Sequence, residues 1–572
     1  MKKILVFAIA ALATLAISGC QDFLDVQPEG SPTTTTYFQT DAQAENAVKA
    51  IYAPMYDGDD GFGREIYWEQ TATCQFVVGK TKGWSSTLSK MVPSGDESPL
   101  ADQYKLFTKL IARANWMISA LLEKAGKTAL TDVEKRSLGE AYFQRGFLHF
   151  MIAYRHGCKT QGVPAVKYEK FDGDYDYSIP PQQPTVMDNY AMIIEDFETA
   201  KTYLPRFETY GPDERGRAHQ AACVGMMARV YAYWAAYDTS KWDNVISCVN
   251  ELENAYGRDL AKTYHKLFDS NWNGGDPDGW WGPEYIWSIP SSGGSDWHRG
   301  GVEMPGVVLE NTAWGVYNGW GQCKPSLDAY REMLKDGEGN ERLKTNILCY
   351  GEEFQFPSDA TLQTVKTWRF FSTSDIEAGF MINKWMEPFS HADFVNTGYV
   401  NYSGDWPTAR VNWHIIRFAD CLLLRAEANL AKNNAAAATT DINRVRERSG
   451  LKPVTTATWA DIYHERFCEL AYEFAADHFG DLRRWAISGA PEIKALSIAE
   501  MEKHPDVRHY VDRSNPDSEL DPSYDYETPG GSPYEDKTFV GKKWEDYKVC
   551  FPYSSSELSK SAGQLKQNPG WE

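Results

Sequence analysis

The chain has 572 residues, of which 42% are hydrophobic and 24% are charged, a balance typical of a large globular protein. Its formal net charge of −21 argues against nucleic acid as a partner, because nucleic-acid binding needs a basic surface that displaces counterions. The same acidity argues against docking on anionic lipid headgroups through a polybasic face.

The N-terminus has the pattern of a bacterial lipoprotein leader. Two lysines precede an apolar run from 4 to 17, which is too short to span a bilayer with margin. The Ser-Gly-Cys that follows resembles a lipobox, in which the cysteine is acylated and becomes the first mature residue. We therefore predict a signal peptide over residues 1–19 and lipid attachment at Cys20, which would tether a body that lies outside the bilayer. Ordinary secretion with an incidental cysteine is the alternative.

Helical periodicity dominates the next part of the chain. Apolar spacing predicts helices over about 41–56, 104–122, 141–154, 185–204, 219–238 and 241–256. The helix at 141–154 is apolar on nearly every side, so we expect it to be buried. Small residues at Gly146, Ala228 and Ala426 would let helices cross closely, as tetratricopeptide-like packing requires. No clean repeat of about 34 residues is present, which indicates that the tetratricopeptide-like helix pairs have diverged from one another.

Three consecutive helices are predicted between residues 410 and 485. The first is indicated by apolar residues at helical spacing: Ile415, Ile416, Ala419, Leu422, Leu423, Ala426 and Leu430. It ends near Asn433, because asparagine tolerates a left-handed cap. The second helix stops at Gly450, where the lack of a Cβ permits positive φ. Thr458 opens the third helix as the first residue of a capping-box pattern with Asp461.

These C-terminal motifs and the N-terminal arm together resemble the RagB/SusD family of outer-membrane nutrient-uptake lipoproteins. The resemblance is carried by DFLDVQPEGSPTTTTYF near the N-terminus and by LLLRAEANL, DINRVRERSG, ERFCELAYE, DLRRW and FPYSSSELSKSAGQLKQNPGWE. One departure follows Glu473: the chain has FAADHF where the family usually has Gly-x-Arg, so DLRRW is displaced by a short insertion. The resemblance implies a mainly α, SusD-like fold, in which a tetratricopeptide-like scaffold supports a large loop-rich insertion.

The chain accordingly divides into four predicted parts. They are the leader at 1–19, an N-terminal region with an extended arm, helix pairs and ligand-side loops at 20–262, a loop-rich insertion at 263–409, and a C-terminal helical region and tail at 410–572. The insertion is rich in Gly, Trp, Asn and Pro. Long irregular structure inside a compact protein is usually functional.

Aromatic residues in the loop-rich parts form the predicted ligand site. The apolar C–H face of a sugar ring packs on an aromatic surface, while its hydroxyls bind polar side chains in the plane. The resemblance implies a shallow glycan site in the insertion loops, although the family has no fixed site motif. The residues that we predict are Trp68, Trp84, Trp280, Trp281, Trp297 and Trp320. The alternative role for any one of them is to fill the seam between loops and scaffold.

Other candidate sites have simpler interpretations. Residues 269–274 match the first half of a calcium-binding loop but lack its bidentate Glu, and 172–176 are similar, so we interpret both as solvated turns. Glu465, Glu469 and Glu473 lie four apart, and nearby arginines favour a structural ion-pair network over catalysis. No nucleophile elbow, metal-binding His pair or phosphate-binding loop is evident.

The cysteines and histidines also indicate no cofactor or metal. Apart from Cys20 there are nine cysteines and no CxxC, so a disulfide framework or zinc site is not predicted. Cysteines 223, 248, 421 and 468 fall in helical patterns, where a thiol behaves as a small buried apolar group.

The resulting hypothesis is a non-catalytic glycan-binding lipoprotein of the outer membrane, facing outside the cell. The resemblance implies that it delivers oligosaccharide or polysaccharide to a SusC-like TonB-dependent transporter. A glycoside hydrolase on a helical scaffold is one alternative, because paired carboxylates are defined only in space. A surface lipoprotein that binds peptide or protein is the other.

Overall fold

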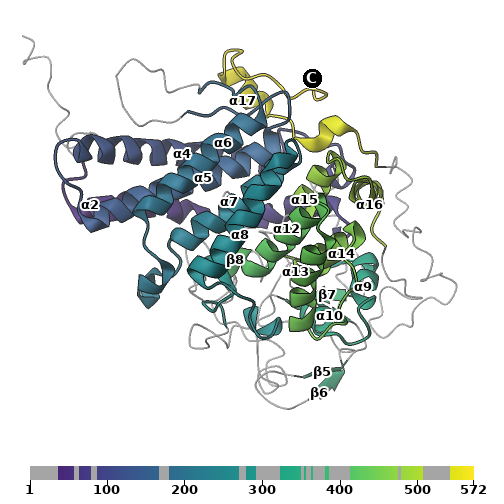
Figure 1. Cartoon of the computed structure of the whole chain (residues 1–572). Helices are drawn as coiled ribbons and strands as arrows, with labels where there is room; N and C mark the ends of the chain where they lie inside the picture. The colour runs from purple at the N-terminus through teal and green to yellow at the C-terminus, as the bar shows by residue number, and fades with distance from the viewer. Residues whose placement is uncertain are drawn as a thin grey trace, which may run out of the picture.

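The structure is a computed structural model, and helices dominate it (Figure 1). The residues that it describes are 37–56, 64–78, 87–166, 180–268, 279–290, 323–349, 353–355, 362–364, 380–384, 412–473, 478–506 and 542–572. Within them, no helix is both long enough and apolar enough to cross a membrane.

Antiparallel helices stacked one on the next form the scaffold. The N-terminal half contributes α2 (Asp41–Tyr52), α4 (Ser98–Ala125), α5 (Asp132–His156), α6 (Val186–Tyr203), α7 (Gln220–Ala235) and α8 (Trp242–Tyr256). The C-terminal half contributes α12 (Phe418–Ala431), α13 (Ala435–Arg448), α14 (Trp459–Glu469), α15 (His478–Ala486), α16 (Pro491–Met501) and α17 (Ser555–Lys560). Helix α8 packs directly against α12 (Figure 1). The helical array is therefore continuous in space, although the insertion separates these two helices in the sequence.

Local sequence signals set the ends of many helices. Threonine capping boxes begin α2, α5, α6 and α14, and the box at Thr458 is the predicted one. Asn433 has φ 59°, and Gly450 has φ +67°, so both predicted left-handed stops are confirmed. Each such cap stabilises its helix by about 1 kcal/mol, because it satisfies backbone groups that have no partner inside the helix.

The centre of the scaffold is α5, and the predicted burial of residues 141–154 is confirmed. Gly146 lies where α5 crosses α6, and a Cβ built there would be 3.2 Å from the Cβ of Asp196. Arg145 donates to that same Asp196, with Nη2–Oδ1 at 2.6 Å, and the pair is buried. Close helix approach and a satisfied buried ion pair therefore coincide at this crossing.

The strands are short and pair in twos. They are β1 (Phe76–Val78) with β3 (Cys323–Pro325), β2 (Tyr285–Ile289) with β8 (Trp413–Arg417), β4 (Ile347–Cys349) with β7 (Phe380–Ile382), and β5 (Glu353–Gln355) with β6 (Leu362–Thr364), all antiparallel. Two short helices, α9 (Leu327–Leu334) and α10 (Glu341–Asn346), also lie in the predicted insertion. The described parts of that region are thus small elements joined to the scaffold by strand pairs.

One predicted helix start is wrong. Ile415 and Ile416 belong to β8, and α12 begins only at Phe418. Every residue of β2 and β8 is buried, so β8 is covered on both faces and shows no alternation of buried and exposed positions. A short apolar run of this kind cannot be told from a buried helical turn by periodicity. The third helix is also shorter than predicted, since α14 ends at Glu469 before Leu470.

Candidate functional site

The structure describes three of the six predicted ligand-binding tryptophans. Trp68 is only 2% exposed and packs edge-on against Phe551, with ring centroids 5.0 Å apart. Trp280 is likewise buried, at 6%. Both rings are therefore packed inside the protein, between loops and scaffold, and neither has an exposed face on which a sugar could stack. Trp281 is half-buried and packs T-shaped on Tyr285, with centroids 4.9 Å apart.

The other predicted positions lie outside the described residues. They are Trp84, Trp297 and Trp320, together with Cys20 and both Asp-rich turns at 172–176 and 269–274. Their roles in ligand binding, lipid attachment and metal binding stay predictions.

A groove of about 640 Å³ is present among the described residues. Its lining residues come from α4, from the connection that follows α5, and from α17 with the tail beyond it. Its lining includes Tyr104, Lys105, Thr108, Lys109, Ile111, Asn115, Trp116, Ser119, Pro164, Val166, Pro180, Glu557, Lys560 and Leu565. The volume is in the range of small-molecule sites, which are also mostly apolar with a few polar groups.

Aromatic and basic side chains occupy different places in this groove. Trp116 is half-buried, and its indole packs against Tyr37 and Phe38, with ring centroids 5.5 and 4.9 Å away. Lys105 and Lys109 are exposed and lie one turn apart on α4, so they lie along the same side of the helix. The groove thus combines an aromatic wall with a basic rim, although the chain as a whole is acidic.

The C-terminal motif holds the second wall of the groove in place. Asn568 is fully buried and donates through Nδ2 to the carbonyls of His156 and Phe551 at 2.7 and 2.6 Å. Gln161 donates to Asn568 Oδ1 at 2.9 Å and to the carbonyl of Lys566 at 3.0 Å. The QNPGWE ending therefore fastens the tail after α17 to the end of α5.

The groove was not predicted from the sequence, because its walls come from segments that are distant in the chain. The sequence feature that could have indicated it is the pair of exposed lysines on α4, Lys105 and Lys109.

The carboxylates that could have been catalytic are in an ion-pair network, as predicted, but their partners include arginines far away in the sequence, whereas the nearby Arg466, Arg483 and Arg484 pair with other carboxylates. Arg417 lies between Glu284, Glu469 and Glu473, with N–O distances of 2.6, 2.7 and 2.8 Å. Glu465 pairs with Arg342 at 2.6 Å. Burial raises the pKa of Glu469, but neighbouring guanidiniums, chiefly those of Arg448 and Arg417, outweigh it and bring that pKa to about 2. Glu469 is therefore ionised, already partnered and a poor proton donor at neutral pH.

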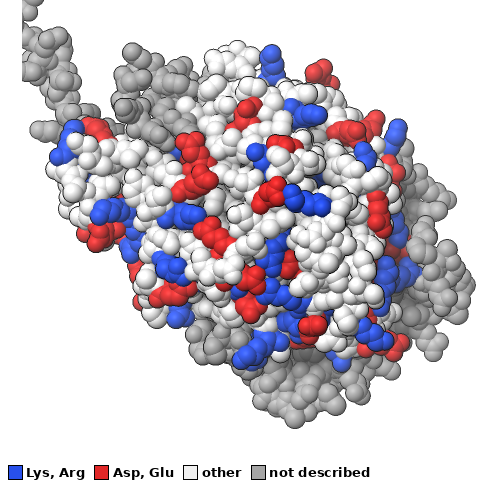
Figure 2. Space-filling view, viewed as in Figure 1, with Lys and Arg blue, Asp and Glu red and all other residues white. Residues whose placement is uncertain are grey.

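Surface charge is mixed where it can be seen. Figure 2 shows basic and acidic groups interspersed over the visible face rather than gathered into a field of one sign. A surface of this kind favours recognition through shape and hydrogen bonds over attraction of a highly charged polymer.

The helical array and its appended groove define a tetratricopeptide-like scaffold protein with a SusD-like fold. A model described as "SusD family" matches residues 253–571, and one described as "Starch-binding associating with outer membrane" matches residues 22–232. Because the first match alone covers more than half of the chain, the protein belongs to the SusD family.

Individual relatives agree with this assignment. A SusD-like protein of Bacteroides ovatus is 22% identical over 500 residues, which cover 84% of this chain and 82% of the relative. A solved SusD-like protein from Bacteroides fragilis is similar with a TM-score of 0.68 at 20% identity, covering 93% of this chain and 98% of that one. Surface glycan-binding protein A from Bacteroides thetaiotaomicron, solved with laminarihexaose, gives a TM-score of 0.62 at 17% identity, covering 92% and 99%.

Proposed function

We propose that this protein is a lipid-anchored, outward-facing outer-membrane protein that binds oligosaccharides or polysaccharides without cleaving them and delivers them to a TonB-dependent transporter. The observation that carries the proposal is membership of the SusD family, supported by fold similarity to a protein solved with laminarihexaose. The second family description, which refers to starch binding and the outer membrane, supports the ligand class and the location.

The proposed binding mode is aromatic stacking combined with hydrogen bonds to hydroxyl groups. Trp297 and Trp320 of the insertion and Trp84 of the N-terminal region remain proposed stacking residues. Trp281 is the described member of the predicted set that keeps some exposed surface. The groove beside Trp116 is a second surface with an aromatic wall and polar neighbours. Each stacked ring is expected to contribute about 0.5–1.5 kcal/mol beyond the area that it buries.

The ion-pair network supports a non-catalytic role. Glycoside hydrolysis needs one carboxylic acid with a raised pKa to protonate the leaving group. Glu469 has instead a pKa of about 2, and the pKa of Glu473 is also lowered because Arg417 and Lys384 outweigh the effect of burial. Neither residue suits the role of general acid.

Affinity electrophoresis tests the site. The protein without residues 1–20 is run through gels containing a panel of polysaccharides that includes laminarin and starch. We expect one polysaccharide to retard the wild type. We also expect the Trp297→Ala, Trp320→Ala double variant to migrate freely, while Trp459→Ala, a half-buried tryptophan on α14, serves as the matched control.

A separate Trp116→Ala variant tests whether the groove is the glycan-binding site. Loss of retardation only in this variant would move the site from the insertion loops to the groove and keep the glycan function. Retardation that survives in every tryptophan variant would contradict the stacking mode. No retardation by any polysaccharide would favour a peptide or protein ligand.

A further inference from the structure

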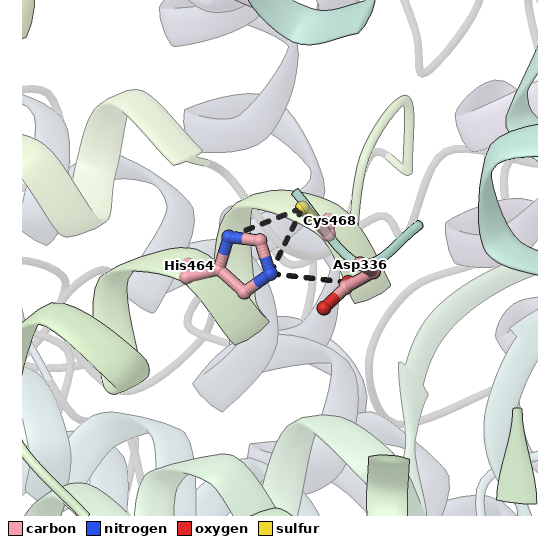
Figure 3. Close-up of side chains that lie close together, drawn as sticks. All are labelled: Asp336, His464 and Cys468. Atoms are coloured by element: carbon pink, nitrogen blue, oxygen red, sulfur yellow. Dashed lines mark hydrogen bonds and ion pairs between the residues drawn. The ribbon is translucent and has the colours of Figure 1, made fainter. Parts of the chain in front are cut away.

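Three metal-ligating side chains converge where the insertion meets the scaffold. His464 and Cys468 lie one turn apart on α14, and Asp336 lies in the turn that follows α9 (Figure 3). His464 Nε2 is 3.1 Å from Asp336 Oδ2 and 4.0 Å from Cys468 Sγ. One ligand atom from each residue lies within 4.8 Å of the other two. Around a tetrahedral zinc ion such separations are about 3.3–3.6 Å, so the two distances from His464 Nε2 each need to change by less than about 0.5 Å.

The histidine is also oriented as a metal ligand would be. Glu332 Oε1 lies 2.7 Å from Nδ1 of His464 and can accept its proton. That arrangement fixes the tautomer whose Nε2 lone pair faces Asp336, and it reproduces the carboxylate–histidine pairing found behind metal-bound imidazoles.

Neighbouring groups hold Asp336 and leave an approach to the site. Arg342 and Arg446 donate to its carboxylate at 2.6 and 3.0 Å, and each carboxylate oxygen has a further lone pair for a metal. Cys468 is fully buried, whereas the side chain of His464 is 14% exposed. An ion could therefore enter past the imidazole and meet the thiol beneath it.

Charged groups of both signs surround the cluster. The carboxylates that face it are those of Glu332, Asp336 and Glu465, and the cations are those of Lys335, Arg342 and Arg446.

We propose that Asp336, His464 and Cys468 form a binding site for a borderline-soft divalent metal ion, with Zn²⁺ as the best match. A thiolate and an imidazole select zinc-class ions over Ca²⁺ and Mg²⁺, which prefer all-oxygen ligands. The fourth position faces the side of the imidazole and is available to water or to another ligand. The bound ion would tie α14 of the scaffold to the turn after α9. Sequence spacing did not show the site, because Asp336 lies 128 residues before His464.

Cobalt substitution and calorimetry test the site on the metal-free protein. We expect Co²⁺ to bind at one ion per chain with a thiolate-to-cobalt charge-transfer band, and Zn²⁺ to displace it. Because a thiolate ligand must lose its proton, Zn²⁺ binding is expected to release protons and to become tighter as the pH rises.

Three variants separate the site from general metal binding. Cys468→Ser should abolish the charge-transfer band and the rise in Tm that Zn²⁺ causes, and Glu332→Gln should weaken Zn²⁺ binding about 10- to 100-fold. Cys248→Ser, a buried thiol on α8, should behave as wild type. Binding that is unchanged in Cys468→Ser, or no stoichiometric binding by a folded wild type, would overturn the proposal. It stands independently of the glycan function.

Discussion

Single buried residues fix how the insertion joins the scaffold, and Arg417 is the most heavily connected of them. Its guanidinium, on the last residue of β8, bonds Glu284 beside β2, Glu469 at the end of α14, and Glu473 just beyond that helix. Burial lowers its pKa, but those carboxylates raise it well above the ordinary value of arginine. Such a group is always charged, so removing it leaves three buried carboxylates without their shared partner.

Arg417→Met is therefore expected to reduce the free energy of unfolding by about 3–5 kcal/mol, the usual cost of breaking a buried ion pair. Chemical denaturation followed by tryptophan fluorescence measures this change. Arg113→Met is the matched control, because its half-exposed guanidinium bonds a single carbonyl, that of Ala50. Equal stability of Arg417→Met and this control would contradict the assigned role.

The same network gives a defined pH dependence. Glu469 has a pKa of about 2 in the folded chain against 4.5 for a free glutamate. A lowered folded-state pKa means that its stabilising contribution is complete above about pH 4.5 and is lost as the pH falls through about 2. We expect the free energy of unfolding to decrease from about pH 5 downward, with a shallower decrease in Glu469→Gln. Parallel pH profiles of the two proteins would argue against an ionised, paired Glu469.

At the scale of elements, helices were predictable wherever periodicity and caps agreed. Residues 185–204 and 241–256 were predicted nearly to their ends, because capping boxes or a left-handed glycine mark them. The pairing of β2 with β8 was not predictable, because it joins a segment inside the insertion to one just after it and both strands are buried on two faces. The groove was missed for the same reason, since its walls come from α4 and from the tail after α17.

The crossing of α5 and α6 offers a test of element packing. Gly146→Leu would place a side chain where a Cβ is already 3.2 Å from Asp196 Cβ and 3.3 Å from the Phe197 ring. We expect destabilisation by about 1–3 kcal/mol or more from overpacking, measured as a lower denaturation midpoint. Gly126→Ala, at the C-cap of α4 with φ −69°, meets nothing closer than 3.5 Å and should be nearly neutral. Similar midpoints for the two variants would show that α5 and α6 are less closely packed than described.

At the scale of the whole molecule, the proposed lipid anchor at Cys20 can be tested directly. Cys20→Ala should release the protein from the outer-membrane fraction to the soluble fraction, because the proposed anchor requires an acylated thiol at this position. Cell fractionation with immunoblotting measures the shift, and Cys74→Ala, which alters a buried thiol, is the control. Retention of Cys20→Ala in the membrane fraction would place the anchor elsewhere.

The central claim is that the protein binds glycan and leaves it intact. Isothermal titration of the wild-type body with defined oligosaccharides, laminarihexaose among them, tests this claim most directly when each mixture is afterwards analysed for chain length. We predict saturable binding of at least one oligosaccharide at one molecule per chain, with the ligand recovered uncut. Absence of binding across the panel, or recovery of shortened products that disappear in a single Asp or Glu variant, would contradict the account.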